Sequence, residues 1–168
     1  MTLPERVYRL FSRKEPPYYL KYSILKLICK PIRKYITNVI AANCPFNTIR
    51  IFLYRCCGFK IGKKCFIGMR CYLDDLCYDY ITIGNNVIIS YGVFFACHGR
   101  NQKHLPITIK DNAYIGMRTS IISKNRDKER EGIIIGESAV IGACSLINMD
   151  IPDGATAVGS PCRIINEK

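Results

Sequence analysis

The sequence repeats every six residues from Ile61 onward. Each unit opens with a large apolar residue, glycine often follows it, and the fifth position is mostly small or β-branched, as in IGKKCF, IGMRCY, IGNNVI and IGESAV. The units begin at positions 61, 67, 73, 83, 89, 95, 109, 115, 121, 135, 141, 147 and 153, of which twelve of thirteen hold Ile, Leu or Phe and one holds Asp153. A short fixed period predicts a mainly β solenoid, because each unit buries its apolar face only by stacking on the next. We expect the first and fifth positions to point inward, and Gly, Asn and Asp to form the corners that need positive φ.

This register accounts for much of the cysteine content. Among ten cysteines, Cys65, Cys71 and Cys77 are six residues apart and fall in the small inward position, where a thiol acts as a small hydrophobic group. The chain has no Cys-x-x-Cys pair and only two histidines, which argues against a structural zinc site and against a histidine-rich metal centre. We therefore expect reduced thiols and no required metal.

The positive charge is concentrated before the repeats. Residues 1–60 carry twelve Lys and Arg against two acids, whereas residues 61–168 carry thirteen against eleven. Residues 18–42 have apolar residues at helical spacing with basic residues between them, and Pro31 marks a kink or a second start. We divide the chain into a basic helical segment, 1–60, and a repeat region with a C-terminal closing segment, 61–168.

A short helix is predicted just before the repeats, with Asn47 as its N-cap and Gly58 as its stop signal. Its apolar positions fall on one face, which we expect to pack on the repeats: Ile49, Phe52, Leu53 and Cys56.

The basic segment suits an anionic membrane surface, a neighbouring subunit or solvent, and nucleic acid less well. The longest uncharged run, Tyr35 to Ile49, has 15 residues, which is short of the ~20 that a spanning helix needs. No hydrophobic signal core opens the sequence. We expect a cytoplasmic protein, with peripheral contact at the inner face of the membrane through residues 18–42 as a hypothesis.

The repeats and the C-terminal run IGESAVIGACSLINMDIPDGATAVGSPCRII resemble the hexapeptide-repeat acyltransferase family over residues 61 to about 165. The basic lead-in RCCGFKIGKKCFIG is similar to that of sugar-modifying members of the family. The resemblance implies a left-handed parallel β-helix preceded by short helices. It also implies a homotrimer with the active site between subunits, and acetyl-CoA as the acyl donor.

In such a β-helix three units make one coil, so every third unit lies on the same face. The period is interrupted only after the third, sixth and ninth units, which places the insertions DDLCYDY, HGRNQKHLP and KNRDKEREG at one corner in successive coils. Solenoids commonly gather such insertions on the binding face.

The middle insertion contains the candidate base. The family pattern places the catalytic histidine at His98, and an imidazole suits proton abstraction near neutral pH. His104, in the same loop, is expected to contact the acceptor or to be the alternative base. The acid that orients His98, or binds the acceptor, is expected among Asp74, Asp75 and Asp79, and Asp75 is preferred. Further acceptor contacts are expected from Asn101 and Gln102.

Matching the family pattern places acetyl-CoA contacts at Met117, Ala143, Asn148 and Arg163, with Arg163 pairing with a phosphate. One departure concerns the residues before the Asp-x-Pro turn. Many members have Thr-Lys there, whereas this chain has Asn148 and Met149, so we expect Lys168 or a basic residue of a neighbouring subunit to supply the cationic contact.

These observations favour transfer of an acetyl group from acetyl-CoA to a hydroxyl or amine of a sugar or glycan precursor, with His98 as general base. The alternative is a non-catalytic β-helix scaffold or binding subunit. A γ-type carbonic anhydrase would need three histidine ligands, and the chain has two. A nucleic-acid binder is suggested by charge alone, and the repeat region is nearly neutral.

Overall fold

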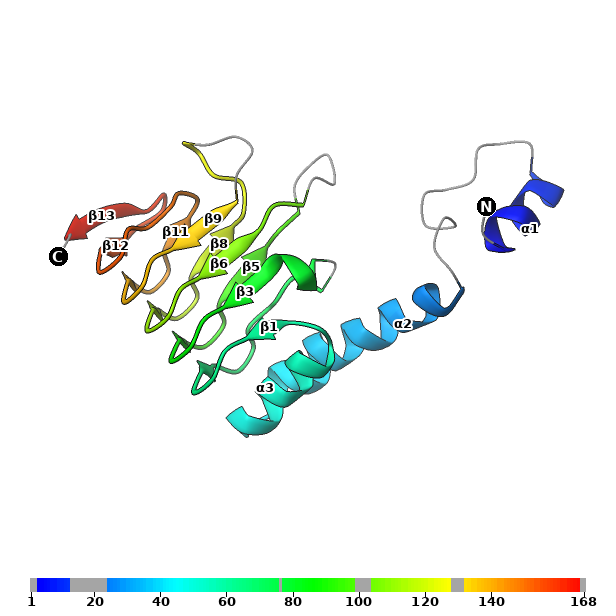
Figure 1. The fold of residues 1–168 in the computed structure, drawn as a ribbon, viewed down its shortest axis with the longest axis horizontal. Helices are drawn as coiled ribbons and strands as arrows, with labels where there is room; N and C mark the ends of the chain where they lie inside the picture. Colours follow the sequence, from blue (N-terminus) through cyan, green and yellow to red (C-terminus); the bar gives the residue numbers. More distant parts are fainter. Residues whose placement is uncertain (1–2, 13–23, 76, 99–103, 128–131, 167–168) are drawn as a thin grey trace. The chain divides into compact units, whose positions relative to one another are not determined.

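The computed structural model describes residues 3–12, 24–75, 77–98, 104–127 and 132–166 (Figure 1). The chain forms two compact units, Met1–Tyr35 and Ile36–Lys168, so residues 36–60 group with the repeats. The first unit contains helices α1 (Leu3–Phe11) and α2 (Ile24–Tyr35), and α2 includes Pro31. The second opens with the π-helical segment η2 (Ile36–Ala41) and helix α3 (Asn47–Cys56). Among the described residues, no helix is both long enough and apolar enough to span a membrane.

The repeats form three parallel sheets that wrap around one core, with the coils stacked from β1 to β12 (Figure 1). The first sheet contains β1 (Lys60–Ile61), β3 (Ile81–Ile83), β6 (Ile107–Ile109) and β9 (Ile133–Ile135). The second contains β2 (Phe66–Ile67), β4 (Ile88–Ile89), β7 (Tyr114–Ile115), β10 (Val140–Ile141) and β12 (Thr156–Val158), with β13 (Arg163–Asn166) antiparallel at its edge. The third contains β5 (Phe94–Ala96), β8 (Ser120–Ile122) and β11 (Leu146–Ile147), and η3 (Tyr78–Tyr80) is a short 3-10 turn.

Strand register confirms the six-residue period and the rule of three units per coil. Ile61 pairs with Ile83, and the same column continues through Ile109 and Ile135. Among the described residues, side chains at the first and fifth unit positions are buried, except for the half-buried Ile61 and the exposed Asp153, since alternate residues of these short strands face the core. The core is therefore a stack of isoleucine layers separated by small residues.

The last unit begins at Ile151 and not at position 153, which corrects the predicted register. Ile151 pairs with Ile135, and Ala157, predicted at a fifth position, occupies a first position opposite Ile141. Asp153 instead lies at an exposed corner, where its carboxylate accepts hydrogen bonds from Lys110 Nζ (2.9 Å) and from the Glu137 amide (2.8 Å). The Lys110 contact first, and the amide second, lower the pKa of Asp153. A carboxylate held in this way is stable at the surface and would be costly in the core.

The corners follow the prediction in part: Asn86, Asn112, Gly92 and Gly154 have the expected positive φ, but so do Lys, Arg, Ser and Cys residues that the prediction did not include. Positive φ angles of 53° to 60° occur at the fourth position of the units, where the residues are Lys64, Arg70, Asn86, Asn112, Arg118, Ser138 and Cys144. The glycines at the second position instead allow the backbones of successive coils to lie close together. A Cβ atom on Gly62 would lie 2.3 Å from the carbonyl oxygen of Gly84 in the next coil.

Helix α3 packs on β1 and β2, but of the predicted face only Leu53 packs against the core, and Ile49, Phe52 and Cys56 are exposed. Phe52 is 63% exposed, whereas Arg50, Ile51 and Tyr54 are buried. The guanidinium of Arg50 can be buried because it donates to the carbonyl oxygens of Ile67 (2.6 Å) and Cys44.

Asn47 does not act as an N-cap. Its side chain bridges to the repeats, accepting from the Ile67 amide (3.1 Å) and donating to the Cys65 carbonyl (3.0 Å). Gly58, with φ of 98°, follows the end of α3 as predicted.

Candidate active site

The three insertions leave the same corner, as the period predicts. Each follows a strand position of the third sheet, where Tyr72 pairs with Phe94 and Phe95 pairs with Ile121. Each returns to the first sheet, whose strands β3, β6 and β9 are in register. The described parts of these insertions therefore stack in successive coils. Residues 99–103 and 128–131 lie outside the described part of the chain.

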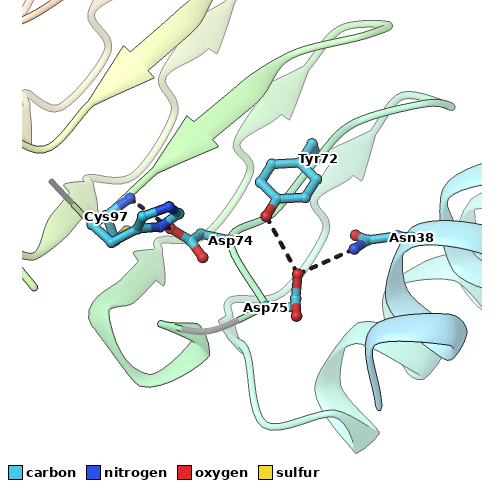
Figure 2. Close-up of polar contacts among 6 residues, drawn as sticks. Asn38, Tyr72, Asp74, Asp75 and Cys97 are labelled. Atoms are coloured by element: carbon cyan, nitrogen blue, oxygen red, sulfur yellow. Dashed lines mark hydrogen bonds and ion pairs between the residues drawn. The ribbon is translucent and has the colours of Figure 1, made fainter. Parts of the chain in front are cut away.

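An aspartate–histidine pair lies at this corner. Asp74 is fully buried, and its Oδ2 lies 2.5 Å from Nδ1 of His98 and accepts a hydrogen bond from the Cys97 amide at 2.9 Å. Figure 2 shows the Asp74 carboxylate directed toward Cys97. A carboxylate only accepts, so Nδ1 of His98 carries the hydrogen and Nε2 keeps its lone pair. The His98 side chain is 34% exposed, which leaves this base accessible to a substrate.

The thiol of Cys77 lies beside the same pair. Burial, followed by the negative charge of Asp74, raises the pKa of Cys77 to about 12. Burial likewise raises the pKa of Cys97. Both thiols are protonated at neutral pH, so neither is suited to act as a thiolate nucleophile.

Asp75 points away from Asp74 and belongs to a different network (Figure 2). Its Oδ1 accepts hydrogen bonds from Nδ2 of Asn38 (3.1 Å) and from the hydroxyl of Tyr72 (3.3 Å). Burial, with the charge of Asp75 second, raises the pKa of Tyr72. The acid against His98 is thus Asp74, whereas Asp75, which the sequence analysis preferred, connects η2 to the corner.

Of the other acceptor candidates, His104 and Asp79 lie near this pair. His104 forms an antiparallel bridge with His98, and its ring packs edge-on against Tyr80 with centroids 5.7 Å apart. Asp79 lies in η3 and is exposed. Asn101 and Gln102 lie outside the described residues.

Three of the four predicted donor contacts border the third sheet. Met117 and Ala143 occupy the corner between the second and third sheets in successive coils, and the amide of Cys144 donates to the Met117 carbonyl at 2.8 Å. Asn148 follows β11 at the opposite corner. The outer surface of β5, β8 and β11 thus lies between Met117 and Ala143 on one side and His98 on the other. Arg163 is exposed and begins β13 in the second sheet.

Arg126 is a residue that the sequence analysis missed. Its guanidinium Nη2 lies 2.8 Å from Sδ of Met149, and Nη1 donates to the Cys162 carbonyl at 3.2 Å. The third insertion therefore brings a cation to the position where many family members carry a lysine. The sequence signal was the run of charges in KNRDKEREG, but only the fold shows which one reaches Met149.

The comparisons agree with this architecture. The family model "Hexapeptide repeat of succinyl-transferase" matches residues 58–95 and 106–148. The chain is 31% identical over 143 residues to YvoF, a candidate acetyltransferase of Bacillus subtilis (strain 168), covering 83% of this chain and 78% of that protein. It is 34% identical over 123 residues to galactoside O-acetyltransferase of Escherichia coli (strain K12), covering 65% of this chain and 57% of that protein, so it spans just over half of that relative.

A solved structure, galactoside acetyltransferase in complex with coenzyme A, has the same fold. It matches with a TM-score of 0.56 and 24% identity, covering 83% of this chain and 79% of that one. The expected fold class, a left-handed parallel β-helix preceded by short N-terminal helices, is confirmed. With the repeats, their register and these relatives together, the chain belongs to the hexapeptide-repeat acetyltransferase family.

Proposed function

We propose that this protein transfers an acetyl group from acetyl-CoA to a hydroxyl or amine of a sugar or glycan precursor, with His98 as the general base. The observation that carries the proposal is the Asp74–His98 pair, which exposes Nε2 at the corner where the insertions gather. The galactoside specificity named for the Escherichia coli relative supports a sugar acceptor. The coenzyme A in the related solved structure supports the donor.

The chemistry follows from the hydrogen on Nδ1. Nε2 of His98 removes the proton from the acceptor group while the acceptor atom attacks the thioester carbonyl carbon. A new acyl–oxygen or acyl–nitrogen bond forms, the carbon–sulfur bond breaks, and His98 returns the proton to the departing thiolate. Asp74 holds the imidazole in one orientation and offsets its positive charge while it is protonated. No metal is needed for these steps.

Donor binding is assigned to the third sheet. Met117 and Ala143 would supply contacts at one corner, and Asn148 at the other. Arg163 would pair with a phosphate, and Arg126 would replace the cation that Met149 cannot supply. Acceptor binding is assigned to Asp75, Asn101 and His104, of which Asp75 is only 4% exposed and would act mainly through its contacts with Asn38 and Tyr72.

The assembly and location are part of the same proposal. A homotrimer would complete the site between subunits, and residues 18–42 would hold it at the inner face of the membrane, where lipid-linked acceptors are found. Of that segment, residues 18–23 lie outside the described part of the chain.

A thiol-release screen tests the function. Purified protein is incubated with acetyl-CoA and, separately, with nucleotide sugars, free sugars and glycan precursors, and free coenzyme A is measured. We expect acceptor-dependent release that is lost in His98→Ala. Binding of a sugar ligand without any release in the wild-type protein would favour the scaffold or binding subunit instead.

A further inference from the structure

Three different metal-ligating side chains converge at the insertion corner. Asp74, Cys77 and His98 each offer one ligand atom, and these atoms all lie within 4.8 Å of one another. We propose that they form an inhibitory site for a zinc-like divalent cation. The binding itself needs only these three residues, whereas the inhibition rests on the function of His98 proposed above.

The ligand set favours a borderline-soft ion. One thiolate sulfur, one imidazole nitrogen and one carboxylate oxygen suit Zn²⁺ or Co²⁺, and suit Mg²⁺ or Ca²⁺ poorly because those ions prefer oxygen. Asp74 and Cys77 are buried, while His98 is about one-third exposed. The site thus has two buried ligands, Asp74 and Cys77, and is open to solvent beside His98, where water can occupy a fourth coordination position.

The backbone holds the two buried ligands together. The Cys77 amide donates to the Asp74 carbonyl at 3.2 Å, so both side chains belong to one turn. The Cys97 amide fixes the Asp74 carboxylate from the next coil, immediately before His98. Two of the three ligands are therefore positioned before any ion arrives, which reduces the ordering cost of binding.

One contact has to widen. Nδ1 of His98 and Oδ2 of Asp74 are 2.5 Å apart, whereas two ligands of a tetrahedral zinc ion are separated by roughly 3.3 Å, given zinc–ligand bonds of ~2.0–2.2 Å. The required shift is less than about 1 Å. It falls on the imidazole, which is the exposed partner.

Occupancy would remove the base by changing its tautomer. The cation binds the Nδ1 lone pair, so the neutral ring carries its hydrogen on Nε2 and no longer accepts a proton there. Cys77 releases its thiol proton to solvent and binds as thiolate, and Asp74 binds as the carboxylate it already is. One proton is released for each ion bound, and no electron is transferred.

The test uses the full-length chain with a reductant that does not bind metal. Binding is measured with Co²⁺, whose thiolate charge-transfer band reports a sulfur ligand, and with Zn²⁺ by competition against a chromogenic chelator. Cys77→Ser is compared with Cys71→Ser. Cys71 is a matched control because it is buried, occupies the same position one unit earlier and contacts the Ser90 carbonyl instead of Asp74.

We expect the wild type and Cys71→Ser to bind one equivalent of cation. Cys77→Ser should lose the charge-transfer band and bind on the order of 100-fold more weakly. His98→Ala should also weaken binding, which gives a second variant if Cys77→Ser does not fold. Equal affinity and equal cobalt spectra for Cys77→Ser and Cys71→Ser would overturn the site.

Inhibition is measured separately, as thiol release against free Zn²⁺, with each variant compared to its own metal-free rate. We expect inhibition of the wild type and of Cys71→Ser at zinc concentrations that leave Cys77→Ser active. Equal inhibition of Cys77→Ser and Cys71→Ser would overturn the inhibitory role. Because the binding readouts need no turnover, a protein that binds zinc as described but releases no thiol would refute the acetyltransferase proposal and leave the metal site intact.

Discussion

At the scale of single residues, the chemistry depends on which nitrogen of His98 carries the hydrogen. Since Asp74 fixes the hydrogen on Nδ1, removal of the ring should remove the base and little else. His98→Ala is expected to lower turnover by about 10²–10⁴ while coenzyme A affinity stays nearly unchanged, because the base acts on the acceptor. Steady-state thiol release and calorimetric titration with coenzyme A measure the two quantities.

Asp74→Asn extends this prediction to the positioning residue. It should lower kcat without raising the KM for acetyl-CoA, because the ring loses its orientation and its counter-charge. Asp79→Asn, an exposed acid in the same insertion, is the control and should keep full kcat. The reverse result, a loss in Asp79→Asn alone, would transfer the positioning role to Asp79.

Buried thiols give the protein a defined alkaline limit. The pKa of Cys77 is raised from 9.0 to about 12 in the folded state, and burial raises the pKa of Cys71 and Cys97 as well. A raised pKa means that the folded state retains protons that the unfolded chain releases, so stability is complete below pH 9 and falls as the pH rises toward 12. Thermal unfolding at pH 7.5, 9 and 10 should show a falling Tm. A smaller fall is expected in Cys77→Ser, and an identical fall would exclude a contribution from this thiol.

Sequence reasoning placed His98 at the insertion corner and named Asp74 among three candidate partners, but it preferred Asp75 to Asp74. The position of His98 follows from the repeat register and the family pattern, both of which are linear features. The choice between Asp74 and Asp75 depends on which way each side chain points, and the spacing of the repeats does not decide this. Neighbouring residues in an extended chain point to opposite sides. Asp74 faces the next coil and Asp75 faces η2 (Figure 2).

At the scale of elements, stability depends on how closely successive coils approach. Gly62→Ala would place a methyl group 2.3 Å from the Gly84 carbonyl oxygen, a backbone atom that cannot move alone. We expect a loss of about 1–3 kcal/mol in the free energy of unfolding, as for other overpacked interiors. Ser90→Ala, at the same unit position but already carrying a Cβ atom, should cost much less. Denaturant unfolding compares the two, and equal losses would reject the close-approach explanation.

The period predicted elements better than it predicted the ends of the repeat region. Isoleucines at fixed spacing determine the three sheets and their register, because each sheet column is built from equivalent positions. The start of the last unit was misplaced because it lies four residues, and not six, after the start of the preceding unit at Ile147. The pairing of Ile151 with Ile135 reveals this shorter spacing. The buried face of α3 was misassigned because hydropathy does not anticipate that carbonyl oxygens satisfy Arg50.

The basic helices lead to a prediction about lipid binding. Helix α2 carries Lys30, Arg33 and Lys34, and Ile32 is exposed beside them. Such an amphipathic arrangement suits an anionic bilayer surface. Flotation with anionic and neutral liposomes at low salt should show binding to the anionic vesicles alone, weakened in Ile32→Asp. Ile165→Asp, which changes an exposed isoleucine of β13, should bind normally. If the protein does not bind anionic vesicles, the segment is better explained as packing within the protein or against a neighbouring subunit.

At the scale of the whole molecule, the second sheet presents an apolar column on its outer surface. Phe66, Ile88, Tyr114 and Val140 are direct register partners on β2, β4, β7 and β10, and each is 40–46% exposed. The corresponding column of the first sheet is mixed, with Lys60, Thr82 and Thr108 followed by the exposed Ile134. A continuous apolar column across several coils is typical of a protein interface, because water contact with it is unfavourable. We propose that this column contributes to the trimer.

Light scattering tests this assembly and the surface that forms it. A trimer of the 19.2 kDa chain has three times that mass, about 58 kDa, and we expect this value at micromolar concentration. Ile88→Glu should shift the mass toward the monomer, because a charge at the centre of the column would be buried without a partner. The Ile88→Glu monomer should still fold, because the side chain of Ile88 points away from the core, whereas the neighbouring Ile89 side chain is buried in it. Thr108→Glu, the equivalent change on the first sheet, should leave the trimer intact. A wild-type mass near 19 kDa would exclude the trimer, and dissociation by Thr108→Glu alone would move the interface to the first sheet.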